Sequence, residues 1–302
     1  MQQIEKNNIA WINLANAGTD DLLFLKDKFR LHSSVLSQLP IAIKRPKIEE
    51  YSDYLFLVLH FPVFNPKIRQ TTPTELDFII TRKAIITIYQ EPIPTLETFF
   101  NECLYREATQ HDYFQRTGYL FFCILDKLID SCLPMLDHIQ ENIDIIENKI
   151  FQGHEKEMLS EIAIVKRDII DFRRTIKPQR SVLEILAQKA NRFFDFDLDF
   201  ISQEVIGSNI RVWNTLENLK DMIEAIEETN NSLLSYKINT ILKTLTLLSF
   251  ITFPLSLIAA ILSMSTGLPN FLQGSYAFWT VVSFMVLTSF GMFLLFKKKK
   301  WL

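Results

Sequence analysis

Serine hydroxyls repeat along one side of an uncharged stretch near the end of the sequence. Ser249, Ser256 and Ser263 are seven residues apart, with Phe253 and Ala260 between them. At about 100° per residue, all five side chains lie on one side of a helix. Two interpretations are open: small residues that let helices pack closely, or a wetted face whose oxygens replace part of an ion's hydration shell. The second requires several copies of the chain, because one pair of helices cannot enclose a pore.

Carboxylates form two further groups on segments with helical periodicity. They are Glu141, Asp144 and Glu147 in the first group, and Glu217, Asp221, Glu224, Glu227 and Glu228 in the second. Such faces are usually solvated, although they attract cations where subunits bring them together. His60 lies in an apolar segment without a second ligand at metal-binding spacing, which favours a core or turn role over a ligand role. No Ser/His/Asp set, Gly-rich phosphate loop or HExxH motif stands out, so we do not expect an enzyme.

The composition averages conceal two different parts. The 302 residues carry a net charge of -3 and 22% are charged, yet residues 244–296 contain no Asp, Glu, Lys or Arg. A mildly acidic body with a basic end lacks the face that nucleic-acid binding needs, so no nucleic-acid partner is expected. The three cysteines, Cys103, Cys123 and Cys132, lack CxxC spacing and are expected to be free, buried thiols. The N-terminal residues predict no cleavable secretory signal.

Two apolar segments, residues 245–264 and 276–296, predict a transmembrane hairpin. Each has about 20 residues, enough for a helix to cross a hydrocarbon core roughly 30 Å thick. Lys237 and Lys243 precede the first segment, and four lysines in the tail 297–302 follow the second. The positive-inside rule therefore places both termini in the cytoplasm and the loop 265–275 outside. We expect a multi-pass protein of the cell inner (plasma) membrane.

The remaining sequence predicts an α+β cytosolic domain and long helices. Residues 1–100 form a small α/β layer, with strand patterns at 9–14, 54–61 and 78–89. Residues 101–200 are a long-helix region that contains a heptad seam from Leu136 to Ile150. A second seam, from Val212 to Ile226, reaches the membrane without a strong breaker. We expect one stalk helix over 201–264, roughly 96 Å long, that continues into the first membrane helix.

This order of segments resembles the CorA-type divalent metal ion transporters. The motifs that carry the resemblance are RPKIEEYSDYLFLVLHFP (45–62), TELDFIITRKAIITIYQEPIPTLE (74–97), FRRTIKPQRSVLEIL (172–186), SLLSYKINTILKTLTLLSFITFPLSLIAAI (232–261) and the terminal FKKKKWL. They cover essentially the whole chain. The resemblance implies a homopentamer with a central pore lined by the first membrane helices and a cytosolic funnel formed by the long helices. It also implies divalent cations as substrate and possible regulator, with no obligatory cofactor.

The resemblance assigns residues to the pore. The lining residues would be Asn239, Leu242, Leu245, Ser249, Phe253, Ser256 and Ala260. Of these, Leu242 and Leu245 match a hydrophobic constriction that gates by dewetting, and Asn239 matches an asparagine at the cytoplasmic end. Glu204 and Glu228 lie near acidic positions of the family and are candidate ligands for a regulatory metal ion.

The pore mouth departs from the family pattern. The family has Gly-Met-Asn where this sequence has Ser263, Met264 and Ser265, and the loop that follows lacks the family's acidic residues. Without these acidic residues, the negative electrostatic potential at the pore entrance is weaker, which predicts an altered selectivity among cations.

Three functions remain open at this point. The leading prediction is passive conduction of Mg²⁺ or another divalent cation. The second alternative is a membrane-anchored regulatory or scaffold protein without Mg²⁺ transport, which the absence of the Gly-Met-Asn triplet also favours. A zinc transporter of the same superfamily is the third, although the pore face offers no His or Cys.

Overall fold

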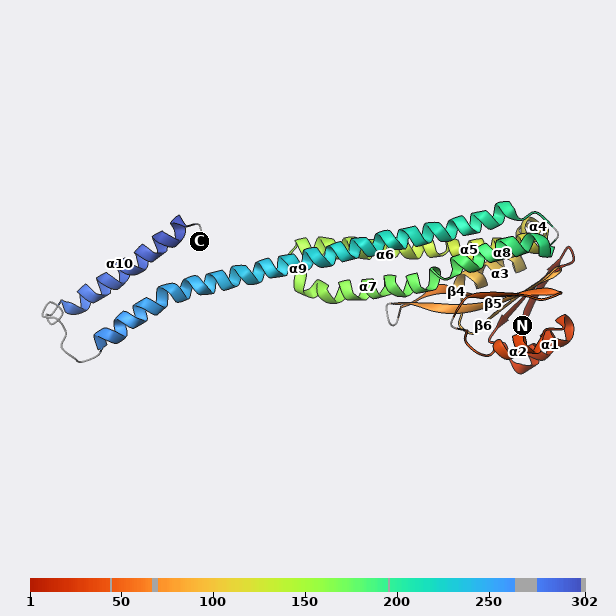
Figure 1. Ribbon diagram of the computed structural model, residues 1–302, viewed down its shortest axis with the longest axis horizontal. Helices are drawn as coiled ribbons and strands as arrows, with labels where there is room; N and C mark the ends of the chain where they lie inside the picture. The colour runs from red at the N-terminus through yellow and green to blue at the C-terminus, as the bar shows by residue number, and fades with distance from the viewer. Residues whose placement is uncertain (44, 67–69, 195, 264–275, 300–302) are drawn as a thin grey trace. The chain divides into compact units, whose positions relative to one another are not determined.

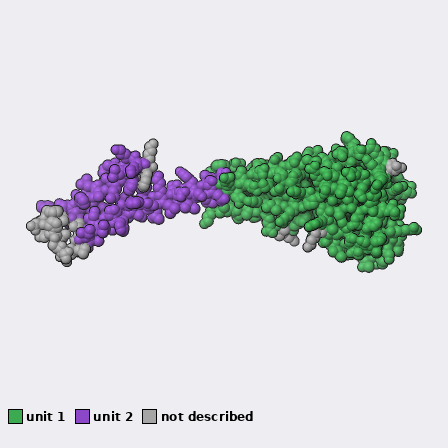
Figure 2. All heavy atoms as spheres, viewed as in Figure 1, with its two compact units in different colours: residues 1–228 green, residues 229–302 purple. Residues whose placement is uncertain are grey.

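The computed structural model describes residues 1–43, 45–66, 70–194, 196–263 and 276–299 (Figure 1). The chain divides into two compact units, residues 1–228 and 229–302 (Figure 2).

The first unit contains a six-stranded sheet. Its strands are β1 (Gln2–Lys6), β2 (Ile9–Ala15), β3 (Lys47–Glu50), β4 (Tyr54–Asn65), β5 (Gln70–Thr81) and β6 (Ala84–Tyr89). They lie in the order β1-β2-β6-β5-β4-β3, and only β2 and β6 pair in parallel. The parallel pair requires a long crossover, which contains α1 (Thr19–Phe29), α2 (Ser33–Gln38) and the strands β3 to β5.

One predicted strand is a hairpin. Residues 78–89 form the end of β5 and the whole of β6, joined by a turn at Arg82 and Lys83. The hydroxyl of Thr81 closes this turn by accepting the Ala84 N–H at 2.8 Å. The two adjacent charged residues interrupt an otherwise apolar run, and they were the sequence signal for the turn. Strand β4 also continues beyond its predicted end at residue 61.

Both faces of the sheet are covered. Ile79 of β5 belongs to the core beneath α1 and α2, with Leu25 and Val35. Its neighbour Phe78 points the other way, because strand residues alternate, and meets Phe121 of α5 (Thr117–Asp130) with ring centroids 5.4 Å apart. The helix α3 (Pro94–Tyr105) lies with α5, and α4 (Glu107–Tyr113) connects them (Figure 1). Side chains in the middle of this sheet, such as that of Asp77 at 3% exposed, are therefore shielded from bulk water.

Long helices complete the first unit. These are α6 (Cys132–Phe151), α7 (Glu155–Ile176), α8 (Gln179–Phe194) and the first part of α9 (Asp199–Ser263). The two predicted seams are buried, one on α6 and one on α9. Two ion pairs connect α7 to α9, Lys166 with Glu227 at 2.6 Å and Arg173 with Glu217 at 2.5 Å. The three cysteines are buried and free, as predicted.

Two apolar helices lie at the C-terminal end. The helix α9 is continuous over 65 residues, about 98 Å, and α10 runs over Ala277–Lys298. Both are long and apolar enough to cross a membrane, and their apolar windows are 6% and 0% buried within the chain. A core helix of a soluble protein would be mostly buried. The predicted fold class, an α+β domain with long helices and two C-terminal membrane helices, is confirmed.

Candidate functional site

The residues predicted to line a pore share one exposed face of α9. Leu242, Leu245 and Phe253 are 52%, 58% and 74% exposed. Asn239, Ser249, Ser256 and Ala260 are also exposed. At about 100° per residue, all seven lie within about 60° of one line along the helix. We call these seven residues the α9 stripe.

The opposite side of α9 faces α10. Leu247 is 8% exposed, and Ile251 and Leu255 line an apolar cleft with Val282 and Phe290 of α10. The mean direction of Leu247, Ile251 and Leu255 lies about 180° from the α9 stripe. Within the chain, α10 therefore covers part of one side of α9. The α9 stripe stays exposed and can contact other copies of the chain.

Hydroxyl groups on this face present acceptor atoms. Ser249 Oγ donates to the Leu245 carbonyl at 3.0 Å, and Ser263 Oγ donates to the Ala260 carbonyl at 2.8 Å. A hydroxyl has one hydrogen and two lone pairs, so both oxygens keep acceptor capacity for a cation or its water shell. Ser256 is exposed on the same face. The stripe carries no acid, base or nucleophile, and its oxygens suit ion passage rather than bond chemistry.

The predicted mouth is only partly described. Ser263 is the last residue of α9, and its side chain is exposed. Met264, Ser265 and the loop 266–275 lie outside the described residues.

The two candidate regulatory glutamates are far apart. Glu204 and Glu228 are both exposed on α9, and the helical rise separates them by about 36 Å. Within one chain they do not share an ion. In the described residues, no group of three or more His, Cys, Asp or Glu side chains is arranged to hold a metal ion.

The structure brings Glu204 close to an acidic pair that the sequence reading missed. Burial, followed by the negative charges of Asp130 and Glu204, raises the pKa of Asp126 on α5. Ser208 of α9 donates a long hydrogen bond of 3.5 Å to Asp126 Oδ1. The spacing of Asp126 and Asp130 could have indicated this acidic pair. They are four residues apart in an apolar helix, and this spacing places both side chains on one face.

Comparison with known proteins identifies the family. The family model described as "CorA-like Mg2+ transporter protein" matches residues 6–298. The chain belongs to the CorA family. The predicted resemblance is thereby confirmed, and with it the assignment to a membrane family of divalent cation transporters rather than enzymes.

CorA-family relatives match nearly the whole chain. The cobalt/magnesium transport protein CorA of Thermotoga maritima is 27% identical over 97% of this chain and 83% of its own length. The zinc transport protein ZntB of Yersinia enterocolitica is 21% identical over 97% and 88%. The solved structure of the CorA magnesium transporter from Methanocaldococcus jannaschii covers 99% of this chain and 93% of its own, with a TM-score of 0.85 and 19% identity. That of full-length CmaX covers 94% and 88%, with a TM-score of 0.74 and 16% identity. At these identities the two structures support the fold.

Proposed function

We propose that this CorA-family chain conducts divalent cations passively through a pore enclosed by the α9 helices of a homopentamer. The observation that carries the proposal is that the uncharged stripe of α9 is exposed, while the opposite side faces α10 across an apolar cleft. One hairpin cannot surround an ion, so the stripe requires further copies. The relatives named as cobalt/magnesium and zinc transport proteins support a divalent substrate.

The proposed orientation follows from lysines at the membrane ends. Lys237 and Lys243 precede the apolar part of α9, and Lys297 and Lys298 end α10. Positive residues favour the cytoplasmic side. The chain accordingly lies in the inner (plasma) membrane with both termini in the cytoplasm, and cations enter near Ser263.

The stripe favours a cation that keeps part of its water shell. Mg²⁺ loses water reluctantly, and hydroxyl oxygens without a fixed charge suit hydrated ions. Leu242 and Leu245 supply the constriction that closes by dewetting. Glu204 and Glu228 are proposed as ligands of regulatory ions where subunits meet, with Asp126 beside Glu204.

Ion flux into proteoliposomes tests the proposal. The purified full chain, exposed to millimolar Mg²⁺, Co²⁺, Ni²⁺ or Zn²⁺ in separate runs, is expected to admit at least one of these ions down its gradient. If none enters, while the protein is correctly inserted, conduction is rejected and the scaffold alternative takes its place. Entry of Zn²⁺ alone would favour the zinc transporter.

Restoring the family triplet tests the selectivity part of the proposal. The double variant Ser263→Gly with Ser265→Asn is expected to raise the ratio of Mg²⁺ to Co²⁺ flux about tenfold, equivalent to about 1.4 kcal/mol. The reason is that an asparagine amide supplies a stronger ligand for water-bound Mg²⁺ than serine does. The matched control is Ser263→Ala with Ser265→Ala, which changes the same positions without supplying the amide. An equal ratio in both double variants would contradict altered selectivity at the mouth.

A further inference from the structure

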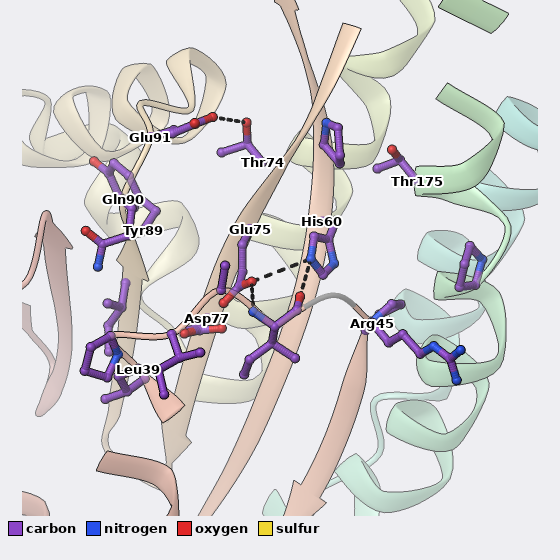
Figure 3. A pocket seen from close by; sticks show the side chains of 18 of the residues that line it. Leu39, Arg45, His60, Thr74, Glu75, Asp77, Tyr89, Gln90, Glu91 and Thr175 are labelled. Atoms are coloured by element: carbon purple, nitrogen blue, oxygen red, sulfur yellow. Dashed lines mark hydrogen bonds and ion pairs between the residues drawn. The ribbon is translucent and has the colours of Figure 1, made fainter. Parts of the chain in front are cut away.

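A cavity of about 440 Å³ opens beside β5 in the first unit (Figure 3). Its size falls within the range of small-molecule sites. Leu39, Ile41 and Ile88 supply apolar walls, and Asp77 and Glu75 of β5 supply carboxylates. This cavity has no part in the proposed pore.

Asp77 occupies a position where the fold calls for an apolar side chain. Its cross-strand partners are Val58 on β4 and Ile88 on β6, and Ile79 follows on the same face of β5. All three belong to the core beneath α1 and α2. Asp77 is only 3% exposed. A carboxylate buried in such a row costs several kcal/mol unless it is paired, and uncompensated groups of this kind are typical of binding sites.

Asp77 lacks such a partner. Its Oδ1 has no hydrogen bond within the described part of the chain. Lys47, whose positive charge acts on Asp77, already bonds Glu49 at 2.6 Å and lies over the ring of Phe56. Burial, reinforced by the charge of Glu75, raises the pKa of Asp77 to about 8. Burial therefore favours the neutral form of this carboxyl group, and a cation bound beside it would favour the ionised form.

Glu75, His60 and Glu91 of the cavity already have partners. Glu75 Oε2 accepts the Ile43 N–H at 2.5 Å, and His60 Nε2 lies 2.7 Å from the Ile43 carbonyl oxygen (Figure 3). These two contacts hold Ile43 against the cavity and give His60 the structural role predicted for it. Glu91 accepts from Thr74 Oγ1 at 3.4 Å. Among the described residues that line this cavity, Asp77 is the one buried carboxylate, and no described group bonds its Oδ1.

The charge pattern selects the class of ligand. The guanidinium of Arg45 points away from Asp77 (Figure 3), and Arg174 interacts with Asp171 at 3.5 Å. An anion would therefore meet carboxylates. A divalent metal ion needs about six oxygen ligands, whereas no group of three or more acidic, His or Cys side chains in the described residues is arranged to hold one.

We infer that this cavity binds a small organic cation, an ammonium or amidinium group on a compact apolar body. The charged end pairs with Asp77 Oδ1, and the apolar end lies against Leu39, Ile41 and Ile88. The inference stands independently of ion conduction through α9.

Fluorine NMR on the full chain in detergent micelles tests the inference. The probe is 4-fluorobenzylammonium, and its neutral counterpart is 4-fluorobenzyl alcohol. We expect the protein to broaden the ammonium signal far more than the alcohol signal. Asp77→Asn should weaken ammonium binding about 10- to 100-fold, as expected for loss of a charge-assisted pair. The matched control is Asp53→Asn, an exposed carboxylate of the same unit outside the cavity, which should change nothing.

The affinity is also expected to depend on pH. Because the cation binds ionised Asp77, its affinity should rise about tenfold per pH unit between pH 6 and 8 and then level off. Among the described residues, the titratable and charged groups around Asp77 are Glu75, His60, Lys47, Glu91, Tyr89, Arg45 and Arg174. The slope attributed to Asp77 is the part that Asp77→Asn removes.

A second variant separates loss of binding from loss of folding. Ala42→Trp adds bulk to the cavity lining while Asp77 stays intact, and it should abolish binding in a folded protein. Equal broadening of the ammonium and alcohol signals, or undiminished ammonium binding by Asp77→Asn, would overturn the inference. So would Mn²⁺ binding that disappears in Asp77→Asn while the ammonium probe never binds, because the site would then be a metal site.

Discussion

Lysine in place of Leu245 is expected to reduce divalent cation flux at least about 100-fold, whereas Thr244→Lys should retain most of the flux. Leu245 lies on the α9 stripe and is 58% exposed in the chain. One positive charge about 5 Å from a divalent cation costs roughly 7 kcal/mol at an effective dielectric constant near 20. Even if the lysine side chain bends away from the ion and this cost is halved, the cation flux is still expected to fall about 100-fold.

Thr244 provides a control at the same depth. It lies about 100° away from Leu245 around the helix, and its hydroxyl donates to the Thr240 carbonyl at 3.0 Å. Lys243 stands beside it in the sequence, so this level of the helix already carries a positive charge. Uptake of Mg²⁺ or Co²⁺ by proteoliposomes with matched protein content measures both variants. Equal loss in both would contradict the assignment of the stripe to the pore.

The second large effect is a pH-dependent gain in stability from Asp77→Asn. The pKa of Asp77 is raised from 3.8 to about 8 in the folded chain. Between these values the folded state holds a proton that the unfolded state has released, so the free energy of unfolding falls as pH rises. The asparagine variant lacks this dependence. The free energy of unfolding of Asp77→Asn should exceed that of the native chain by almost nothing at pH 4, and by on the order of 5 kcal/mol at pH 8 and above.

Urea unfolding at several pH values measures this difference. Trp11 is fully buried in the sheet and reports unfolding of the first unit by fluorescence. The buffers should contain no amines, because a bound organic cation would offset part of the cost. Asp53→Asn controls for the loss of one surface carboxylate. Parallel pH profiles for the native chain and Asp77→Asn would show that the Asp77 carboxyl is not held neutral by its surroundings.

Helical periodicity predicted the long-range organisation of the chain well. The uncharged run after Lys243 and the seam through Val212 and Ile226 together indicated one helix that enters the membrane, and α9 is continuous. These signals are local, because every turn of a helix repeats the same constraint. Periodicity alone did not show which side of α9 meets α10, since both sides are apolar. That choice depends on contacts such as those of Leu247 and Ile251.

Sheet contacts were harder to predict because they join distant residues. Asp77 alternates with Leu76 and Phe78, which in a half-exposed strand would place it in water. Its burial depends on pairing with Val58 and Ile88 and on α1 and α2 covering that face. Neither condition is visible within the strand itself. The proximity of Asp126 to Glu204 was not predicted for the same reason, because the two residues are distant in the sequence.

Thiol modification of the α9 stripe tests the central claim most directly. Ser256→Cys places a thiol on the stripe, and Leu255→Cys places one in the cleft against α10 at nearly the same depth. The native cysteines are buried, so their background reaction should be low. A positively charged methanethiosulfonate reagent is expected to stop divalent cation flux through Ser256→Cys and to leave Leu255→Cys and the native chain conducting. Undiminished flux through Ser256→Cys, with its modification verified by mass spectrometry, would contradict a pore lined by this face of α9.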